Sequence, residues 1–236
     1  MAHGRCAVVT TLSSDSEPAP SVLEFSPASH EYRVDGTLVP SVTQLLEDAG
    51  LTPDYSVVQP AVLQHARERG IHIDACCDLL DADDLDWRSV HPEALPYVEA
   101  WLAFREHEGF TPVASQVPLY HPRYGYAGTL DVVGLLPGNR PVVVERKSTA
   151  KMASTYALQT AGYALDGMWF APPGGGVLTP VPWGPPARLG VQLRRDGSYQ
   201  LVPYDDPEDL AAFLGVVALG RWRGARRALQ PIRRAR

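Results

Sequence analysis

Lys147 is one of only two lysines in the chain, and its position suggests a chemical role. The other is Lys151, so 19 of the 21 Lys plus Arg residues are arginines, and this chain uses arginine wherever a plain positive charge suffices. An ammonium differs from a guanidinium because it is a compact donor whose pKa can fall, so it can orient a water molecule or help to deprotonate it. The alternative is that codon usage depletes lysine and that Lys147 survives by chance.

A carboxylate is expected beside this amine. Glu145 and Lys147 lie at the end of a valine run. Residues i and i+2 of a strand point to the same face, so these two side chains project together while Arg146 points to the other face. Asp131, fourteen residues before Glu145, lies in another strand-like segment. A carboxylate inside a Val/Leu strand needs a partner, because burying an unpaired charge is costly.

A hairpin between the two strands brings the two carboxylates together. The segments 128–136 and 141–148 are rich in Val and Leu, and residues 137–141 between them are dense in turn formers. Two facing carboxylates repel each other unless a cation or a proton lies between them. Mg²⁺ typically takes one or two carboxylates and keeps waters and substrate phosphate in its other positions. The alternative is a buried salt bridge from Lys147 to one carboxylate.

A helix is expected just downstream, over residues 153–167. Ser154 is a candidate N-cap, and Gly167 is a candidate end. Gln159 and Tyr163 are four residues apart and therefore share one face of this helix.

The order of these residues resembles the PD-(D/E)XK nuclease superfamily, and within it the RecB-like branch that includes lambda-type exonucleases and the RecB-like nucleases of CRISPR systems. The pattern runs from Gly128 to Asp131, then to Glu145-x-Lys147, and then to Gln159-x-x-x-Tyr163. The resemblance extends less specifically over about residues 25–215. It implies an α/β fold with a restriction-endonuclease-like core, in which helices flank a central mixed β-sheet.

The same resemblance implies metal-dependent hydrolysis of phosphodiester bonds in DNA, with Mg²⁺ or Mn²⁺ as the cofactor. Asp131, Glu145 and the backbone carbonyl of Arg146 are then the expected metal ligands, and Lys147 positions the attacking water or stabilises charge on the phosphate. The residues expected to orient Lys147 and the DNA backbone are Gln159 and Tyr163. A role in phage or mobile-element recombination, beside a single-strand annealing protein, follows by analogy.

Two positions depart from the pattern of the resembled family. Residues 69–75 are similar to its Gly-x-x-x-His segment, whose histidine helps to bind metal, but Asp74 fills that position. The nearest imidazole, His72, lies roughly 200° around a helix from Asp74. An aspartate is itself an oxygen ligand, so Asp74 is favoured as a metal ligand over His72. The alternative is an ordinary solvated aspartate on a helix face.

The second departure is Gln116, within a strand expected at 113–120, where related nucleases often carry a glutamate. A neutral amide holds a metal less firmly than a carboxylate. This departure and the Asp74 replacement favour a rival function, a catalytically weak or inactive DNA-binding or assembly module that keeps the nuclease fold. An endonuclease of restriction type would share the chemistry, and the sequence does not separate exonuclease from endonuclease action.

Charge divides the chain into a proposed flexible leader at 1–24, a nuclease domain at 25–220 and an arginine-rich tail at 221–236. The tail holds seven arginines and no acids, whereas the other 220 residues hold 14 basic and 27 acidic residues. A basic arm on an acidic body is typical of a polyanion contact. The tail arginines expected to bind DNA phosphates include Arg221, Arg223, Arg226 and Arg227. The alternative is that the tail docks on the acidic body.

Several classes of protein do not fit the composition. No apolar stretch approaches the roughly 18 residues of a membrane span, and nothing resembles a signal peptide, so a cytoplasmic location without a membrane partner is expected. Cys6, Cys76 and Cys77 fit neither a disulfide framework nor the four-cysteine spacing of a zinc or iron–sulfur site, and the adjacent pair is interpreted as buried thiols.

The elements that must position the candidate site alternate between helix and strand patterns. A small hairpin is expected at 31–39, turning at Asp35-Gly36, followed by a helix that Ser41 and Gln44 cap. Residues 171–186 are expected to form a loop. Helices are expected near 41–50, 60–80, 93–108, 154–167 and 206–222, and strands near 113–120, 128–136, 141–148, 187–195 and 198–203.

Overall fold

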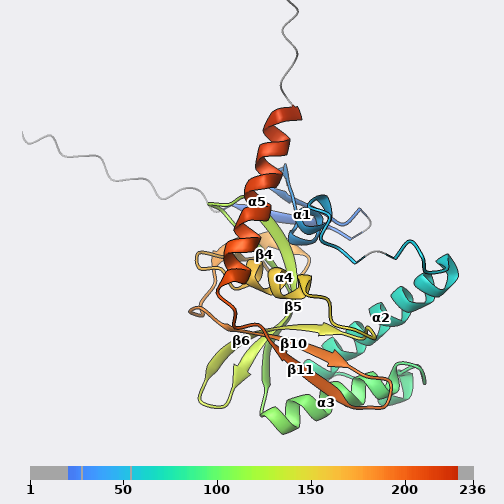
Figure 1. The fold of residues 1–236 in the computed structure, drawn as a ribbon. Helices are drawn as coiled ribbons and strands as arrows, with labels where there is room; N and C mark the ends of the chain where they lie inside the picture. Colours follow the sequence, from blue (N-terminus) through green and yellow to red (C-terminus); the bar gives the residue numbers. More distant parts are fainter. Residues whose placement is uncertain (1–20, 28, 54, 228–236) are drawn as a thin grey trace, which may run out of the picture.

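The computed structural model describes residues 21–27, 29–53 and 55–227, which form a mixed α/β fold around a large mixed sheet with helices on both sides (Figure 1). The expected fold class, a central mixed sheet flanked by helices, is therefore confirmed. The large sheet has the order β11-β10-β6-β5-β4-β7-β9. Its strands are β4 (Thr111–His121), β5 (Tyr126–Leu136), β6 (Arg140–Lys147), β7 (Trp169–Phe170), β9 (Thr179–Pro180), β10 (Ala187–Leu193) and β11 (Tyr199–Pro203).

The centre of the sheet is the predicted hairpin. Strands β5 and β6 pair antiparallel with Val132 opposite Val144 and Val133 opposite Val143. Strand β10 then pairs parallel to β6, and Gly190 lies opposite Glu145. A parallel pair needs a crossover connection, and here the crossover contains helix α4 (Thr155–Tyr163).

Helices cover both faces of the sheet. Helices α2 (Pro60–Asp81) and α3 (Leu95–Glu108) pack on one face, and α1 (Val42–Asp48), α4 and α5 (Glu208–Arg227) pack on the other. In Figure 1, α3 lies below the sheet, α2 runs along its right side, and α1, α4 and α5 lie above it. A strand buried on both sides reads as a continuous apolar run. This explains the run Val142-Val143-Val144. Val142 and Val144 pack into the cluster between the sheet and helices α2 and α3, and Val143 packs into the cluster between the sheet and helices α1, α4 and α5.

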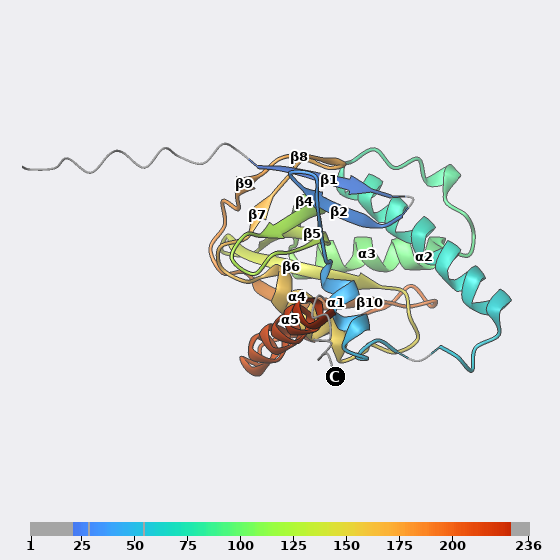
Figure 2. The same ribbon diagram turned by 90° about the horizontal axis from the view of Figure 1, so that it is seen from above.

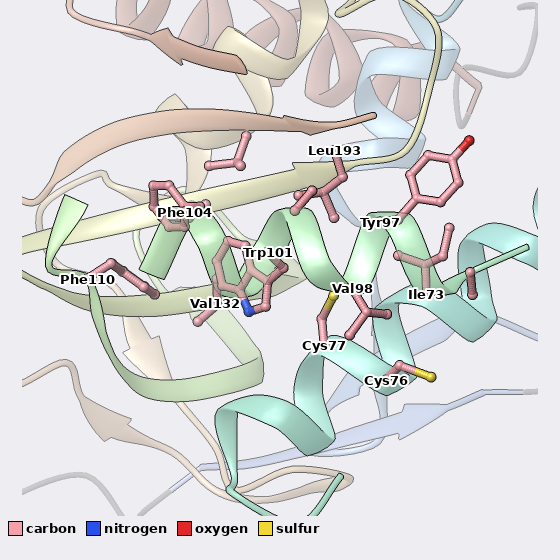
Figure 3. Packing of buried hydrophobic residues seen from close by; sticks show 14 of the residues in the cluster. Ile73, Cys76, Cys77, Tyr97, Val98, Trp101, Phe104, Phe110, Val132 and Leu193 are labelled. Atoms are coloured by element: carbon pink, nitrogen blue, oxygen red, sulfur yellow. The ribbon is translucent and has the colours of Figure 1, made fainter. Parts of the chain in front are cut away.

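In the core between the sheet and helices α2 and α3, Trp101, Phe104 and Phe110 lie toward one end, and Cys76, Cys77 and Tyr97 lie toward the other (Figure 3). The rings of Trp101 and Phe104 stack with centroids 4.9 Å apart, and Phe110 packs against both. Cys76 and Cys77 are buried in the same cluster and are free thiols, as the sequence indicated.

Two segments that the sequence analysis left without strands contain them. Strand β1 (Val22–Ser26) begins inside the expected leader, and the expected loop over 171–186 contains β8 (Gly175–Val177) and β9. Strands β1 and β8 join β2 (Glu31–Val34) and β3 (Thr37–Val39) in a small sheet of order β3-β2-β1-β8, and Figure 2 shows β8 beside β1 and β2. Strand β9 instead pairs with β7 at the edge of the large sheet. At Gly175 an added Cβ would lie 2.5 Å from the Leu23 carbonyl oxygen, so a glycine-rich segment forms this strand pair. Residues 1–20 of the leader lie outside the described residues.

The ends of the elements follow the sequence closely, with two exceptions. The expected turn at Asp35-Gly36 is confirmed, with φ of 49° and 74°, and so is the capping box of Ser41 and Gln44. Helix α4 ends at Tyr163 rather than near 167, and Ser154 precedes it without making a side-chain capping bond. Helix α5 continues to Arg227, so the first part of the expected tail is helical.

None of the helices in the described part of the chain is long and apolar enough to cross a membrane.

Candidate functional site

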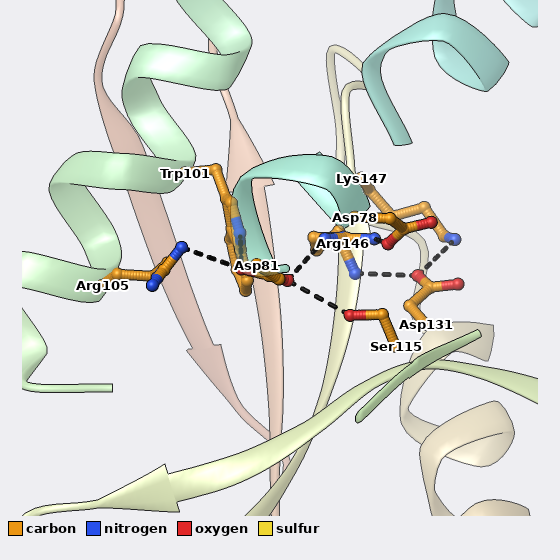
Figure 4. A network of polar contacts seen from close by, with 8 residues as sticks. All are labelled: Asp78, Asp81, Trp101, Arg105, Ser115, Asp131, Arg146 and Lys147. Atoms are coloured by element: carbon orange, nitrogen blue, oxygen red, sulfur yellow. Dashed lines mark hydrogen bonds and ion pairs between the residues drawn. The ribbon is translucent and has the colours of Figure 1, made fainter. Parts of the chain in front are cut away.

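The last three residues of β6 alternate between the two faces of the sheet. Glu145 and Lys147 project from one face, and Arg146 projects from the other. The Lys147 ammonium lies 2.5 Å from Glu145 Oε1 and 3.6 Å from Asp131 Oδ2, so it bridges the two carboxylates. Asp131 Oδ2 also accepts a hydrogen bond of 3.0 Å from the Arg146 backbone N–H (Figure 4). The structure therefore brings Asp131, Glu145 and Lys147 into one cluster, which we call the carboxylate cluster.

Burial sets the electrostatics of this cluster. Glu145 is fully buried, and burial raises its pKa to about 8, with Asp131 adding to the effect and Lys147 opposing it. Burial acts to lower the pKa of Lys147, but Asp131 and Glu145 outweigh it and hold that pKa well above its usual value. A lysine with a raised pKa stays protonated at neutral pH. In this arrangement Lys147 can donate hydrogen bonds and stabilise negative charge, and it is not set up to remove a proton from water.

Asp74 of α2 belongs to the same electrostatic environment. Burial raises its pKa to about 7, the Asp131 carboxylate raises it further, and Arg146 and Lys147 lower it. The imidazole of His72 is engaged elsewhere, because its Nε2 accepts the His91 backbone N–H at 3.2 Å and lies 3.7 Å from a cysteine sulfur. The helix thus places Asp74, rather than His72, near the carboxylate cluster.

The oxygens of the cluster suit a hard divalent cation. Glu145 Oε2 is buried and lacks a hydrogen-bond partner among the described residues, which is a costly arrangement unless something else satisfies it. Within those same residues, no three His, Cys, Asp or Glu side chains are arranged to hold a metal ion by themselves. Mg²⁺ needs only one or two carboxylates when waters and phosphate complete its shell. The donor set therefore fits Mg²⁺ or Mn²⁺ bound mainly by Asp131 and Glu145.

Helix α4 brings the Gln-x-x-x-Tyr residues against the strand that carries Asp131. Tyr163 is buried, and an added Cβ on Gly128 would lie 2.7 Å from its ring, so the glycine leaves room for the tyrosine. Burial raises the pKa of Tyr163 well above its usual value, Glu145 raises it further, and a hydrogen bond with Gln159 opposes the rise. Gln159 and Tyr163 thus pack α4 behind the carboxylate cluster.

Arg146 forms a second charged cluster on the opposite face of β6, which the sequence analysis missed. Its guanidinium is buried, pairs closely with Asp78, and lies 3.2 Å from Asp81 (Figure 4). It also stacks 5.0 Å from the ring centroid of Trp101, whose indole N–H donates to Asp81 at 2.8 Å. We call this group the arginine cluster.

The signal for the arginine cluster was present in the sequence. Asp74, Asp78 and Asp81 are spaced i, i+4 and i+7, so they follow one face of α2. Three acids on one helix face need cations opposite them, and the adjacent Arg146 and Lys147 supply those cations.

Gln116 lies within β4, opposite Asp131 of β5, and is skipped in the pairing of these two strands. The pairs Ser115–Val132 and Val117–Leu130 flank it, and its own φ of 51° is unusual for a residue other than glycine. Its side chain hydrogen-bonds to Asp78 and lowers the pKa of that carboxyl, although burial raises the pKa overall. A glutamate here would add another carboxylate beside Asp78, so the neutral amide suits this setting.

The arginines at the start of the expected tail contact the body of the protein. Arg221 donates to the Arg123 carbonyl oxygen at 2.8 Å, and Arg223 donates to the Asp48 carbonyl oxygen. Both contacts match the alternative in which the basic segment docks on the body. The side chains of Arg226 and Arg227, and all of residues 228–236, lie outside the described part of the structure.

No protein-family model matches this sequence, and no curated protein is significantly similar to it. Any function must therefore be argued from the site itself.

Proposed function

We propose that this chain is a metal-dependent DNA nuclease of the PD-(D/E)XK type, with a restriction-endonuclease-like core. The observation that carries the proposal is the pair Glu145 and Asp131, which share one lysine ammonium while a buried Glu145 oxygen has no partner. A buried carboxylate oxygen that makes no hydrogen bond is costly unless another group satisfies it. A site that leaves one open beside a second carboxylate is suited to a cation.

Each residue of the site has a separate role in this proposal. Asp131, Glu145 and the Arg146 carbonyl, with Asp74 nearby, would hold Mg²⁺ or Mn²⁺, which polarises the phosphate and lowers the pKa of bound water. Lys147, held protonated by its two carboxylates, orients the attacking water and stabilises the charge that develops on the phosphate. Gln159 and Tyr163 would fix the position of α4 against the carboxylate cluster.

By resemblance, the proposed biological role is DNA-end processing by an exonuclease in recombination, beside a single-strand annealing protein. The proposed location is the cytoplasm. The rival proposal is a catalytically weak or inactive DNA-binding or assembly module. Gln116 favours the rival, because an amide stands where related nucleases often carry a ligand. The 2.5 Å contact of Lys147 with Glu145 also favours it, since the same contact can serve as a structural ion pair.

Cleavage of labelled DNA separates these proposals. End-labelled linear DNA and closed circular DNA are incubated with the purified chain in Mg²⁺, Mn²⁺ or EDTA. We expect metal-dependent cleavage, abolished by EDTA and reduced at least about 100-fold in Lys147→Ala and Asp131→Ala. Attack on linear DNA alone indicates an exonuclease, and attack on circles indicates an endonuclease.

A matched control is Arg140→Ala, which removes an exposed cation from the other end of β6 and should leave cleavage unchanged. Circular dichroism of each variant shows that the fold is intact. Wild-type cleavage by folded Lys147→Ala would contradict the site assignment. DNA binding without cleavage in either metal would support the non-catalytic module.

A further inference from the structure

A cavity of about 820 Å³ lies directly beyond the end of β6. Its walls come from the segment before α2, from α2 itself, and from residues 148–156 that lead into α4. The cavity adjoins the carboxylate cluster, because the Lys147 ammonium lies 5.3 Å from the ring centroid of Tyr156, and Tyr156 lines the cavity. A ligand in this space would therefore lie next to Lys147.

Two tyrosines supply flat apolar surface in the cavity. Tyr55 lines the cavity and is 42% exposed, so part of its ring is open to a ligand. Tyr156 is half-buried and lines the same cavity as Tyr55. Two aromatic rings in one cavity suit a planar ligand that can stack on them.

Two cations line the same space without carboxylate partners. Neither Arg69 nor Lys151 forms an ion pair with any residue that the structure describes. The Arg69 guanidinium lies 5.5 Å from the Tyr97 ring centroid, and its Nε is buried without a hydrogen-bond partner. Lys151 is the second of the chain's two lysines, so both lysines lie at or beside the site. The hydroxyls of Ser148 and Thr149 also line the cavity.

The loop that carries Lys151 is held in place. The Gln192 side-chain amide donates to the Thr149 carbonyl oxygen at 2.8 Å, and the Thr149 hydroxyl donates to the Lys151 carbonyl oxygen at 3.1 Å. The loop's backbone is thereby tied to β10, the strand next to β6. Lys151 is thus presented from a loop that hydrogen bonds tie to β10, and Arg69 is presented from α2.

We propose that this cavity binds one unpaired nucleotide of a DNA strand, next to the phosphate that the carboxylate cluster acts on. The base would stack on Tyr55 and Tyr156, and the nucleotide's phosphate would contact Lys151 and Arg69. The volume lies in the range of small-molecule sites. A paired base hides its faces within the duplex stack, so the cavity selects single strands and frayed ends. This inference rests on the proposed nuclease function for its substrate.

Equilibrium binding in EDTA tests the cavity without any cleavage. The probes are a fluorescent single-stranded oligonucleotide and a blunt hairpin duplex of the same base composition, followed by anisotropy with the full-length chain. We expect Tyr55→Ala and Lys151→Ala each to weaken single-strand binding about tenfold, with a clearly smaller effect on the duplex. Tyr55→Phe keeps the stacking surface and should bind like the wild type.

Trp87→Ala is the matched control, because Trp87 is similarly exposed, at 40%, and does not line the cavity. It should leave binding of both probes unchanged. Wild-type single-strand affinity in both Tyr55→Ala and Lys151→Ala overturns the proposal, and so does an equal loss for single strand and duplex.

The cleavage assay reports separately on the nuclease proposal. Selective loss of single-strand binding in a chain that cleaves no DNA would keep the nucleotide site and remove the nuclease function. Metal-dependent cleavage with unaffected binding in the cavity variants would do the reverse.

Discussion

The two faces of β6 carry charged clusters of opposite character within three consecutive residues. On one face the Arg146 guanidinium is enclosed by Asp78, Asp81 and the Trp101 ring. On the other, Lys147 bridges two carboxylates, and a buried oxygen of Glu145 is left without a partner.

The difference supports a structural role for the arginine cluster and the proposed chemical role for the carboxylate cluster. A buried ion pair is tolerated when each charge is well matched and hydrogen-bonded. The arginine cluster largely meets this condition and joins α2 and α3 to the sheet. In the carboxylate cluster, by contrast, Glu145 is fully buried, its Oε2 has no hydrogen-bond partner among the described residues, and burial and the Asp131 charge raise its pKa to about 8. A bound cation would offset the repulsion between the two carboxylates.

The largest effect is expected from breaking the arginine cluster. Arg146→Met would leave Asp78 without its cation and Asp81 with only the Arg105 guanidinium, 3.3 Å away, and should lower the free energy of unfolding by about 3–5 kcal/mol. Urea denaturation followed by circular dichroism measures the change. Arg88→Ala removes an exposed ion pair with Asp86 and should cost less than about 1 kcal/mol. A loss for Arg146→Met as small as that of this control would show that the arginine cluster is not structural.

The next effect concerns catalysis rather than stability. Lys147→Arg keeps the positive charge but replaces a compact ammonium by a flat fork, and we expect cleavage to fall about 100- to 1,000-fold. Unfolding should change by no more than about 1 kcal/mol, because the charge remains paired. Initial rates of DNA cleavage, measured beside urea denaturation, check both parts. A wild-type rate from the arginine variant would mean that charge alone matters at this position.

The unmatched carboxylate should make stability depend on pH. The folded-state pKa of Glu145 is raised to about 8, so the folded protein binds a proton that the unfolded chain has already released. Its stabilising contribution is fully present below the unfolded-state pKa and is lost as pH rises through about 8. Between pH 6 and 9, metal-free wild type should lose about 2 kcal/mol that Glu145→Gln does not lose. Parallel pH profiles for the two proteins would count against an unmatched Glu145.

The smallest effect tests the contribution of α2 to the carboxylate cluster. Asp74→Asn keeps the shape but removes a charge, so the Mn²⁺ concentration for half-maximal cleavage should rise about tenfold. Asp74→His should retain activity and shift the preference toward Mn²⁺, because imidazole suits Mg²⁺ poorly. His72→Ala should behave as wild type, since its ring contacts His91 instead. The opposite pattern, with His72→Ala raising the metal requirement and both Asp74 variants unchanged, would identify the histidine as the ligand.

The sequence predicted the central elements because their patterns are local. The valine run of β6, the turn formers after β5 and the capping box of α1 each depend on residues close together in the chain. It failed at β1 and β8, where glycines and short strands give no periodic pattern and the pairing joins residues far apart. The pairing of β1 with β8 forms only when the rest of the fold brings these two segments together.

The sequence by itself determined which side chains share a face of β6, because alternation along a strand is fixed by backbone geometry. It also determined that the hairpin between β5 and β6 brings Asp131 beside Glu145. Only the tertiary structure decided which carboxylates each cation meets, since Asp74, Asp78 and Asp81 reach β6 through the packing of α2. It also decided the charge states, because the pKa values of Glu145 and Lys147 depend on burial and on neighbours distant in sequence.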